Sequence, residues 1–148
     1  MYKISATLLL FFLSMGYQKK DEVKITFNSN NEEREYAYLS DTAIVRFIPA
    51  KHTSSLYLLH NISVTFEGVS NAKEQFRQNP SLIPDSAPSK NPIIKIPLKN
   101  YMKSNLNDGK VYIDIESVQK IENGKTGPML IPKSQLDRTF SVSIKPRE

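Results

Sequence analysis

The stretch that decides the fold is VYIDIESV, residues 111–118. Its apolar side chains alternate with polar or amphipathic ones, so that two sets would face opposite sides: Val111, Ile113 and Ile115 against Tyr112, Asp114 and Glu116. Alternation with a period of two and enrichment in β-branched residues are typical of a strand with one buried face. The segment therefore predicts a strand of an antiparallel sheet that covers a hydrophobic core on one side.

The same pattern recurs along the chain. It places apolar residues on one side of three further segments: Val23, Ile25 and Phe27; Ile62, Val64 and Phe66; Phe140, Val142 and Ile144. The run TAIVRFI before Pro49 predicts another strand. We expect seven to eight strands in one domain, residues 23–148, folded as a mainly β, antiparallel β-sandwich of immunoglobulin-like or transthyretin-like architecture. A partly open barrel is the second choice.

Local sequence signals predict a helix and turns between these strands. The segment 70–79, SNAKEQFRQN, predicts the one short helix, because Ser70 or Asn71 can cap it and Pro80 ends it. Residues 107–109, NDG, predict a turn, and Asn123-Gly124 predicts a tight hairpin turn.

The N-terminus has the features of a secretion signal. Lys3 precedes an apolar stretch, residues 4–13, and the small residues Ser14 and Gly16 follow. Ten helical residues span about 15 Å, which is half of a bilayer core of about 30 Å. We expect residues 1–16 to be a signal peptide cleaved between Gly16 and Tyr17, followed by a tether, residues 17–22. The alternative is a buried N-terminal element of a cytosolic protein.

The residues around the expected cleavage point carry a resemblance. With a cysteine in place of Tyr17, the leader and the cluster Lys19-Lys20-Asp21-Glu22 resemble the start of a Bacteroides-type bacterial surface lipoprotein. The resemblance implies export to the periplasm, outer membrane or cell surface. Tyrosine has no sulfur for a thioether-linked lipid, so membrane association is expected only if position 17 is lipid-anchored. The protein is either released in soluble form, or Tyr17 replaces a lipidated cysteine.

Two tripeptides agree with that resemblance. Asp41-Thr42-Ala43 and Asp85-Ser86-Ala87 are similar to the short O-glycosylation sequon of the same bacteria. The similarity implies that Thr42 and Ser86 are glycosylation candidates.

The composition of the chain limits the partners and the catalytic or metal sites that we expect. The chain has 148 residues with 20 basic and 15 acidic side chains, a net charge of +5, but its lysines are interspersed with acids. We therefore expect no nucleic-acid partner. The absence of cysteine excludes disulfides, thiol catalysis and cysteine-based zinc sites. His52 and His60 form no metal-binding motif, so no metal or cofactor is expected. No catalytic residue is identified and an enzyme is not expected, although a spatial Ser–His–Asp arrangement stays open.

Residues 80–92, PSLIPDSAPSKNP, contain four prolines and predict an exposed loop. We take Leu82, Ile83, Asp85 and Ser86 as candidate binding residues; the alternative is a plain connector between two sheets. The resulting expectation is an exported cell-envelope binding module with a protein or glycan partner, as an accessory subunit of a larger assembly. A periplasmic immunity protein that neutralises a toxic effector, and a weak hydrolase, are the alternatives.

Overall fold

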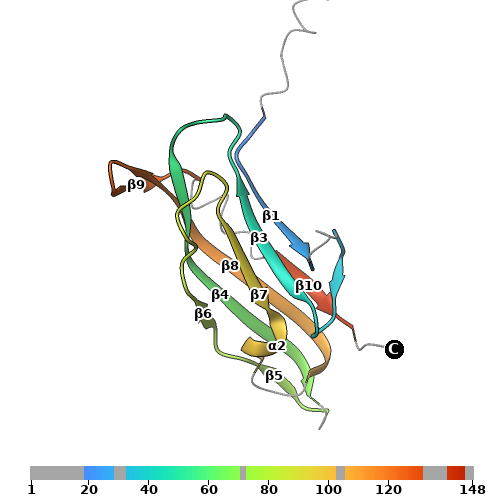
Figure 1. Ribbon diagram of the computed structural model, residues 1–148. Coiled ribbons are helices and arrows are strands. Elements are labelled where there is room, and N and C mark those ends of the chain that lie inside the picture. The colour runs from blue at the N-terminus through green and yellow to red at the C-terminus, as the bar shows by residue number, and fades with distance from the viewer. Residues whose placement is uncertain (1–18, 29–32, 71–72, 103–105, 132–139, 146–148) are drawn as a thin grey trace, which may run out of the picture.

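The computed structural model describes residues 19–28, 33–70, 73–102, 106–131 and 140–145. The described chain is mainly β, as predicted. Its strands are β1 (Glu22–Phe27), β2 (Tyr36–Ala37), β3 (Thr42–Ile48), β4 (Leu56–Ser70), β5 (Gln75–Arg77), β6 (Ser81–Ile83), β7 (Ile93–Pro97), β8 (Leu106–Glu122), β9 (Lys125–Met129) and β10 (Phe140–Ile144). One short helix, α2 (Leu98–Tyr101), follows β7 within these residues (Figure 1).

The described strands form two sheets. One has the order β1-β3-β7, and all its pairings are antiparallel. The other has seven strands: β2-β10-β8-β4-β5 form its main path, β6 pairs with β4, and β9 pairs with β8. Its pairings are antiparallel except for β2, which runs parallel to β10. The long pair β4–β8 is the centre of this sheet, and β7 crosses in front of it in Figure 1.

The two sheets share one hydrophobic core in a sandwich-like arrangement. The small sheet contributes buried side chains that include Phe27, Val45, Phe47 and Ile96, and the large sheet contributes others that include Leu59, Ile62, Val64, Phe66, Val111, Ile113, Ile115 and Val118. The predicted inward set of residues 111–118 is confirmed, because Val111, Ile113 and Ile115 are at most 1 % exposed. Burial of these rows supplies the main favourable free energy of folding.

The inward alternation shifts once, at the same level in β4 and β8. In β4 the inward residues are Tyr57 and Leu59 before the shift and Ile62 after it. Asn61 lies at the shift and has a positive φ of 48°, in the left-handed region that asparagine tolerates better than most residues. In β8 the inward spacing widens to three residues between Ile115 and Val118. The pairing register continues across this level, since His60 lies opposite Ser117 and Ile62 lies opposite Ile115.

Two local predictions were wrong. Residues 75–77 of the expected helix form β5, antiparallel to the end of β4 with Phe76 opposite Gly68, and Lys73 has a positive φ of 62°. A short segment with Phe76 as its one large apolar side chain cannot bury a helical face, so sheet pairing prevails. The expected turn at 107–109 belongs to β8 instead. Asp108 and Gly109 pair with Val69 and Gly68 of β4, and the register shifts before Leu106 pairs with Ser70.

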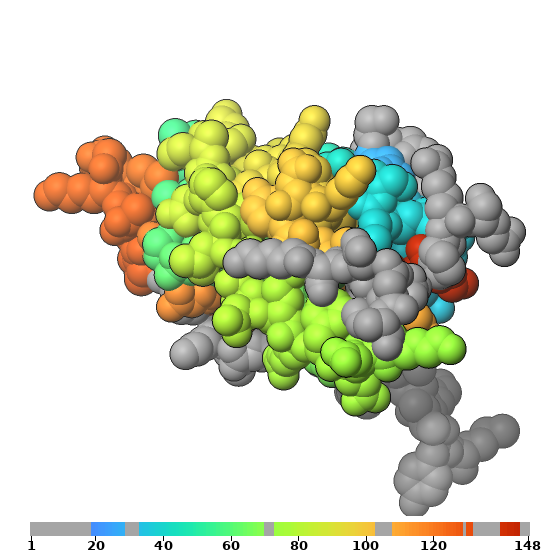
Figure 2. All heavy atoms as spheres, turned by 90° about the horizontal axis from the view of Figure 1, so that it is seen from below, coloured from blue at the N-terminus to red at the C-terminus, as the bar shows by residue number. Residues whose placement is uncertain are grey.

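The Asn123-Gly124 turn is confirmed. Both residues have positive φ values, 53° and 74°, and they join β8 to β9 with Glu122 opposite Lys125. A two-residue turn of this kind has the twist of the flanking strands, which explains why the dipeptide is a reliable hairpin signal. In Figure 2, which views the molecule from below, this hairpin projects as the orange protrusion at one side.

Candidate functional site

The predicted loop, residues 80–92, runs along the outer edge of β4 rather than standing free. Ser81–Ile83 forms β6, which pairs with β4 over Ile62–Val64. Further along, Ser89 and Tyr57 exchange two backbone hydrogen bonds of 2.8 and 2.9 Å. The Pro92 carbonyl then accepts a hydrogen bond from the Phe47 amide in the other sheet. The segment therefore connects the two sheets, as the alternative interpretation of the sequence expected.

Proline suits this edge position. The four prolines are Pro80, Pro84, Pro88 and Pro92, each four residues from the next. Proline has no backbone amide hydrogen to donate. It is therefore tolerated in an edge segment, which pairs with β4 on one side and has no strand on the other. Non-proline residues before and between the prolines supply the donors to β4: the amides of Gln78, Ser86 and Ser89 donate to the carbonyls of Phe66, Leu59 and Tyr57.

The four candidate binding residues do not share one exposed surface. Leu82 is 76 % exposed, whereas Ile83 is 6 % exposed and belongs to the hydrophobic core. Ser86 is also 6 % exposed, and its Oγ accepts a hydrogen bond from the Leu59 amide at 2.8 Å. Asp85 is exposed but holds two groups of β4. Leu82 is thus the one apolar side chain of the four that is open to a partner.

Alternation along β4 and β6 fixes the face on which Leu82 lies. Its neighbour Ile83 is buried opposite Ile62, so Leu82 and its partner Ser63 face the outer side of the large sheet. Ser63 also lies opposite Asp114 of β8. We call the outer edge formed by β5, β6 and the adjoining part of β4 the β5–β6 edge. At this edge Leu82 is an apolar residue with polar neighbours.

A polar cluster adjoins β6 where the inward alternation shifts. Asp85 binds His60 Nδ1 through Oδ2 at 2.8 Å and accepts the Asn61 amide hydrogen through Oδ1 at 3.0 Å. The Asn61 side-chain amide donates to the Glu116 carboxylate of β8. Asparagine tolerates the left-handed backbone at this point, and its side chain and main chain connect β8 to the Asp85 segment.

The electrostatics of Asp85 follow from its partners. Partial burial raises the pKa of the Asp85 carboxyl, but hydrogen bonds from His60 and from the Asn61 amide outweigh it, so its pKa lies below the ordinary aspartate value. The ionised carboxylate is therefore the form that holds residues 84–86 against β4 near neutral pH.

His60 lies between an aspartate and a serine, an order that hydrolases use. It binds Asp85 and lies opposite Ser117 in the β4–β8 pairing. Ser117, however, is 3 % exposed, and its hydroxyl accepts a hydrogen bond from Gln119 at 3.3 Å. The buried Ser117 oxygen has no open approach for a substrate carbonyl in this structure, so this His60–Ser117 pair does not support the hydrolase alternative.

The histidines do not form a metal centre in the described residues. His52 lies exposed in the connection between β3 and β4, whereas His60 lies in β4 and binds Asp85. Within the part of the chain that the structure describes, no group of three or more histidine, cysteine, aspartate or glutamate side chains could hold a metal ion.

The two glycosylation candidates occupy ordered positions of the fold. Thr42 is half-buried in β3, opposite Pro97, and its amide donates to the Asn28 side chain. The preceding Asp41 is buried and binds Arg34 at 2.9 Å and the Tyr38 amide at 2.8 Å. Like Asp85, it uses its carboxylate to hold nearby backbone. Modification of Thr42 and Ser86 stays a prediction.

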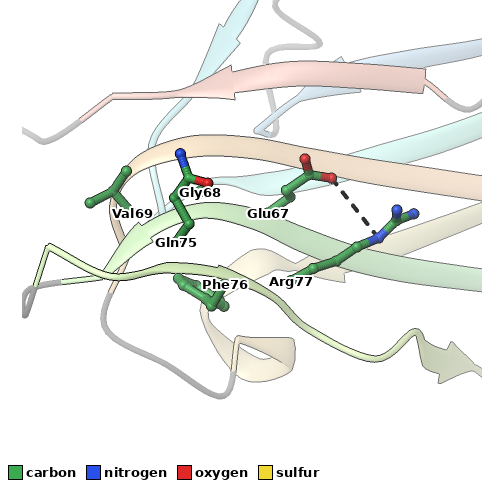
Figure 3. Close-up of a pocket in the computed structure, with 6 residues that line it drawn as sticks. All are labelled: Glu67, Gly68, Val69, Gln75, Phe76 and Arg77. Carbon is green, nitrogen blue, oxygen red and sulfur yellow. Dashed lines mark ion pairs between the residues drawn. The ribbon is translucent and has the colours of Figure 1, made fainter.

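An open pocket lies farther along the β5–β6 edge. It measures about 350 Å³ and is lined by Glu67, Gly68 and Val69 of β4 and by Gln75, Phe76 and Arg77 of β5. Figure 3 shows the Glu67 and Arg77 side chains pointing toward one another, with 3.9 Å between Oε2 and Nε. The pocket extends the β5–β6 edge beyond Leu82 with a charged pair and a half-buried aromatic ring.

Sequence reasoning missed His60, Asn61 and Glu116 as members of the polar cluster. Asp85, the partner of His60 and Asn61, lies 24 residues beyond Asn61, and Glu116, the partner of the Asn61 side chain, lies 55 residues beyond Asn61. No local pattern signals such pairings. The expected cleavage point at Gly16 and Tyr17 lies outside the described residues.

Comparisons with known proteins give no relative from which a role could be transferred. No family model matches the chain, and neither the curated proteins nor the solved structures contain a significant match. Among the helices of the described residues, none is long and apolar enough to cross a membrane.

Proposed function

We propose that the protein is an exported binding module of the bacterial cell envelope that contacts a protein or glycan partner through the β5–β6 edge. It serves in this proposal as an accessory part of a larger envelope assembly. Export is supported by the leader at residues 1–16, with Lys3, the apolar stretch and the small residues in the expected order.

The observation that carries the contact surface is the exposure of Leu82. A leucine that is 76 % exposed on a three-residue strand at a sheet edge is available to a partner, and the neighbouring side chains are polar. Interfaces commonly combine an apolar centre with a polar rim. Here Ser63 and Asp114 lie beside Leu82 across the sheet, and Asp85 follows it along the chain.

The test compares two exposed apolar residues. The wild type, Leu82→Asp and the matched control Ile93→Asp are used to capture partners from solubilised envelope material. Ile93 is 42 % exposed but belongs to β7 of the other sheet. We expect a partner that the wild type and Ile93→Asp capture and that Leu82→Asp loses, with unchanged melting temperatures. Equal capture by all three proteins would remove the β5–β6 edge from the proposal.

A further inference from the structure

Four segments meet at the end of the molecule where the N-terminal tether enters. The Ala50 amide donates to Asp21 Oδ1 at 2.8 Å, which joins the tether to the β3–β4 connection. The Tyr57–Ser89 bonds bring residues 88–91 to the same end, and Tyr57 lies opposite Lys120 of β8. We call residues 19–22, 49–55, 88–91 and 119–125 the N-terminal pole; β9 and the start of β1 lie at this end in Figure 1.

The N-terminal pole is basic. It contains six lysines and three carboxylates, a net charge of +3 with His52 neutral. Five of the lysines are exposed: Lys19, Lys20, Lys51, Lys90 and Lys125. Two of the three carboxylates are engaged within the protein, because Glu122 pairs with Lys120 and Asp21 binds the Ala50 amide. The pole therefore carries a larger share of the chain's positive charge than its length alone would give.

The same end has two partly exposed apolar side chains near the lysines. An open pocket of about 490 Å³ lies between Ser54, Ser55 and Leu56 on one side and Ile121, Glu122, Asn123 and Gly124 on the other. Leu56 is 39 % exposed and lies opposite Ile121 in the β4–β8 pairing. Hydroxyl and amide donors thus surround a partly exposed apolar pair.

We propose that the N-terminal pole rests on an anionic lipid headgroup surface. The charge of the pole is complementary to such a surface, the apolar pair can reach the headgroup boundary, and the tether leads into the same end. Lysines near an anionic leaflet are attracted to it, and the attraction fades within a Debye length of about 10 Å at moderate salt.

This inference rests on the proposed function, since an exported envelope protein is one that meets a lipid surface. It goes beyond the expectation that membrane association needs a lipid at position 17, because the folded domain itself supplies the contact. In this orientation the pocket between β4 and β5 lies at the far end of β4, directed away from the lipid.

The experiment measures sedimentation of the full chain with two kinds of vesicle: phosphatidylcholine alone, and an equimolar mixture of phosphatidylcholine and phosphatidylglycerol. The apolar leader is present in both measurements, so the difference between them reports on headgroup charge. We expect tighter binding to the anionic vesicles and loss of that advantage at high salt.

Two triple variants with the same change in net charge locate the contact. Lys51→Glu, Lys90→Glu and Lys125→Glu together should weaken binding to anionic vesicles by at least about tenfold. The matched control changes the exposed lysines Lys95, Lys99 and Lys110 of β7, α2 and β8 to glutamate and should retain most of the binding. Circular dichroism confirms that both variants are folded.

Two results would overturn the inference directly: equal binding of the wild type to both kinds of vesicle, or equal weakening of binding by the two triple variants. A third is retention of the protein on a heparin column without binding to vesicles, which would assign the pole to an anionic glycan. Leu82→Asp should bind anionic vesicles like the wild type. A failure of the lipid contact is therefore distinguishable from a failure of the β5–β6 edge.

Discussion

The Ser86 hydroxyl accepts a hydrogen bond from the Leu59 amide at 2.8 Å, and the Ser86 amide donates one of 3.0 Å to the Leu59 carbonyl. This double contact binds the proline-rich segment to β4 as an edge of the large sheet. Two roles are separated within the five residues from Leu82 to Ser86, because Leu82 faces out while Ile83 and Ser86 maintain the fold.

Removing the Ser86 hydroxyl should destabilise the protein. Ser86→Ala leaves the buried Leu59 amide without its acceptor, and the expected loss is about 1–3 kcal/mol of unfolding free energy in urea denaturation. Ser89→Ala is the control, since Ser89 binds Tyr57 through its main chain and its hydroxyl accepts an exposed hydrogen bond of 3.3 Å from the Asn91 amide. This variant should change stability by less than about 0.5 kcal/mol. Equal stability of the two variants would show that the Ser86 hydroxyl does not hold this edge.

Truncation should distinguish the two neighbours in β6. Ile83→Ala removes a core side chain and should cost about 2–4 kcal/mol. Leu82→Ala removes an exposed one and should cost less than about 0.5 kcal/mol. Chemical denaturation of both variants measures the difference. A large loss of stability from Leu82→Ala would mean that the side chain is packed and is unavailable as a contact.

The Arg34–Asp41 pair should be a major local anchor. Asp41→Ala leaves the mostly buried Arg34 guanidinium without its carboxylate and the Tyr38 amide without an acceptor. Removing one member of a buried pair costs about 3–5 kcal/mol. The control Asp21→Ala removes an exposed carboxylate that likewise accepts a backbone amide, and a thermal or urea melt should show a much smaller change. Similar melts for the two variants would contradict the assignment.

Gly109 should resist substitution because β4 lies against it. A Cβ at this position would stand 2.2 Å from the Glu67 carbonyl oxygen. Gly109→Ala must therefore shift backbone and should cost about 3 kcal/mol. At Gly124 a Cβ has open space and the cost is that of a positive φ alone, roughly 1 kcal/mol. Unfolding curves in which Gly124→Ala is the less stable variant would refute the close approach.

The contribution of Asp85 to the free energy of unfolding should depend on pH. The pKa of Asp85 is lower in the folded protein than the ordinary value of 3.8. Its stabilising contribution is therefore complete above the unfolded pKa and is lost as the pH falls through the lower folded pKa. The difference in unfolding free energy between the wild type and Asp85→Asn should be steady near pH 5 and shrink toward pH 2. A difference that grows on acidification would reverse the sign of the assignment.

Much of the fold is predictable from local pattern. The alternation at 111–115 and 62–66 identifies the inner face of β4 and β8, because successive side chains of a regular strand point to opposite faces of the sheet. The dipeptide Asn123-Gly124 identifies the hairpin because its backbone requirements are local. These features depend on residues that are close in sequence, which is why the structure agrees with their prediction.

The edge of the large sheet is not predictable in this way. Residues 75–77 pair with the end of β4 although their sequence favours a helix, and residues 107–109 continue β8 although NDG favours a turn. In both places hydrogen bonds to a distant strand outweigh local propensity. The His60–Asp85 contact and the shift at Asn61 also depend on partners that no local pattern specifies.

The most direct test of the central claim is the N-terminal sequence and intact mass of the protein recovered from fractionated cells. The proposed role predicts a chain that begins at Tyr17 and lies outside the cytoplasm, and the mass would also reveal any glycan at Thr42 or Ser86. A chain that retains residues 1–16 and remains in the cytosol would contradict export and, because it depends on export, the proposed envelope role.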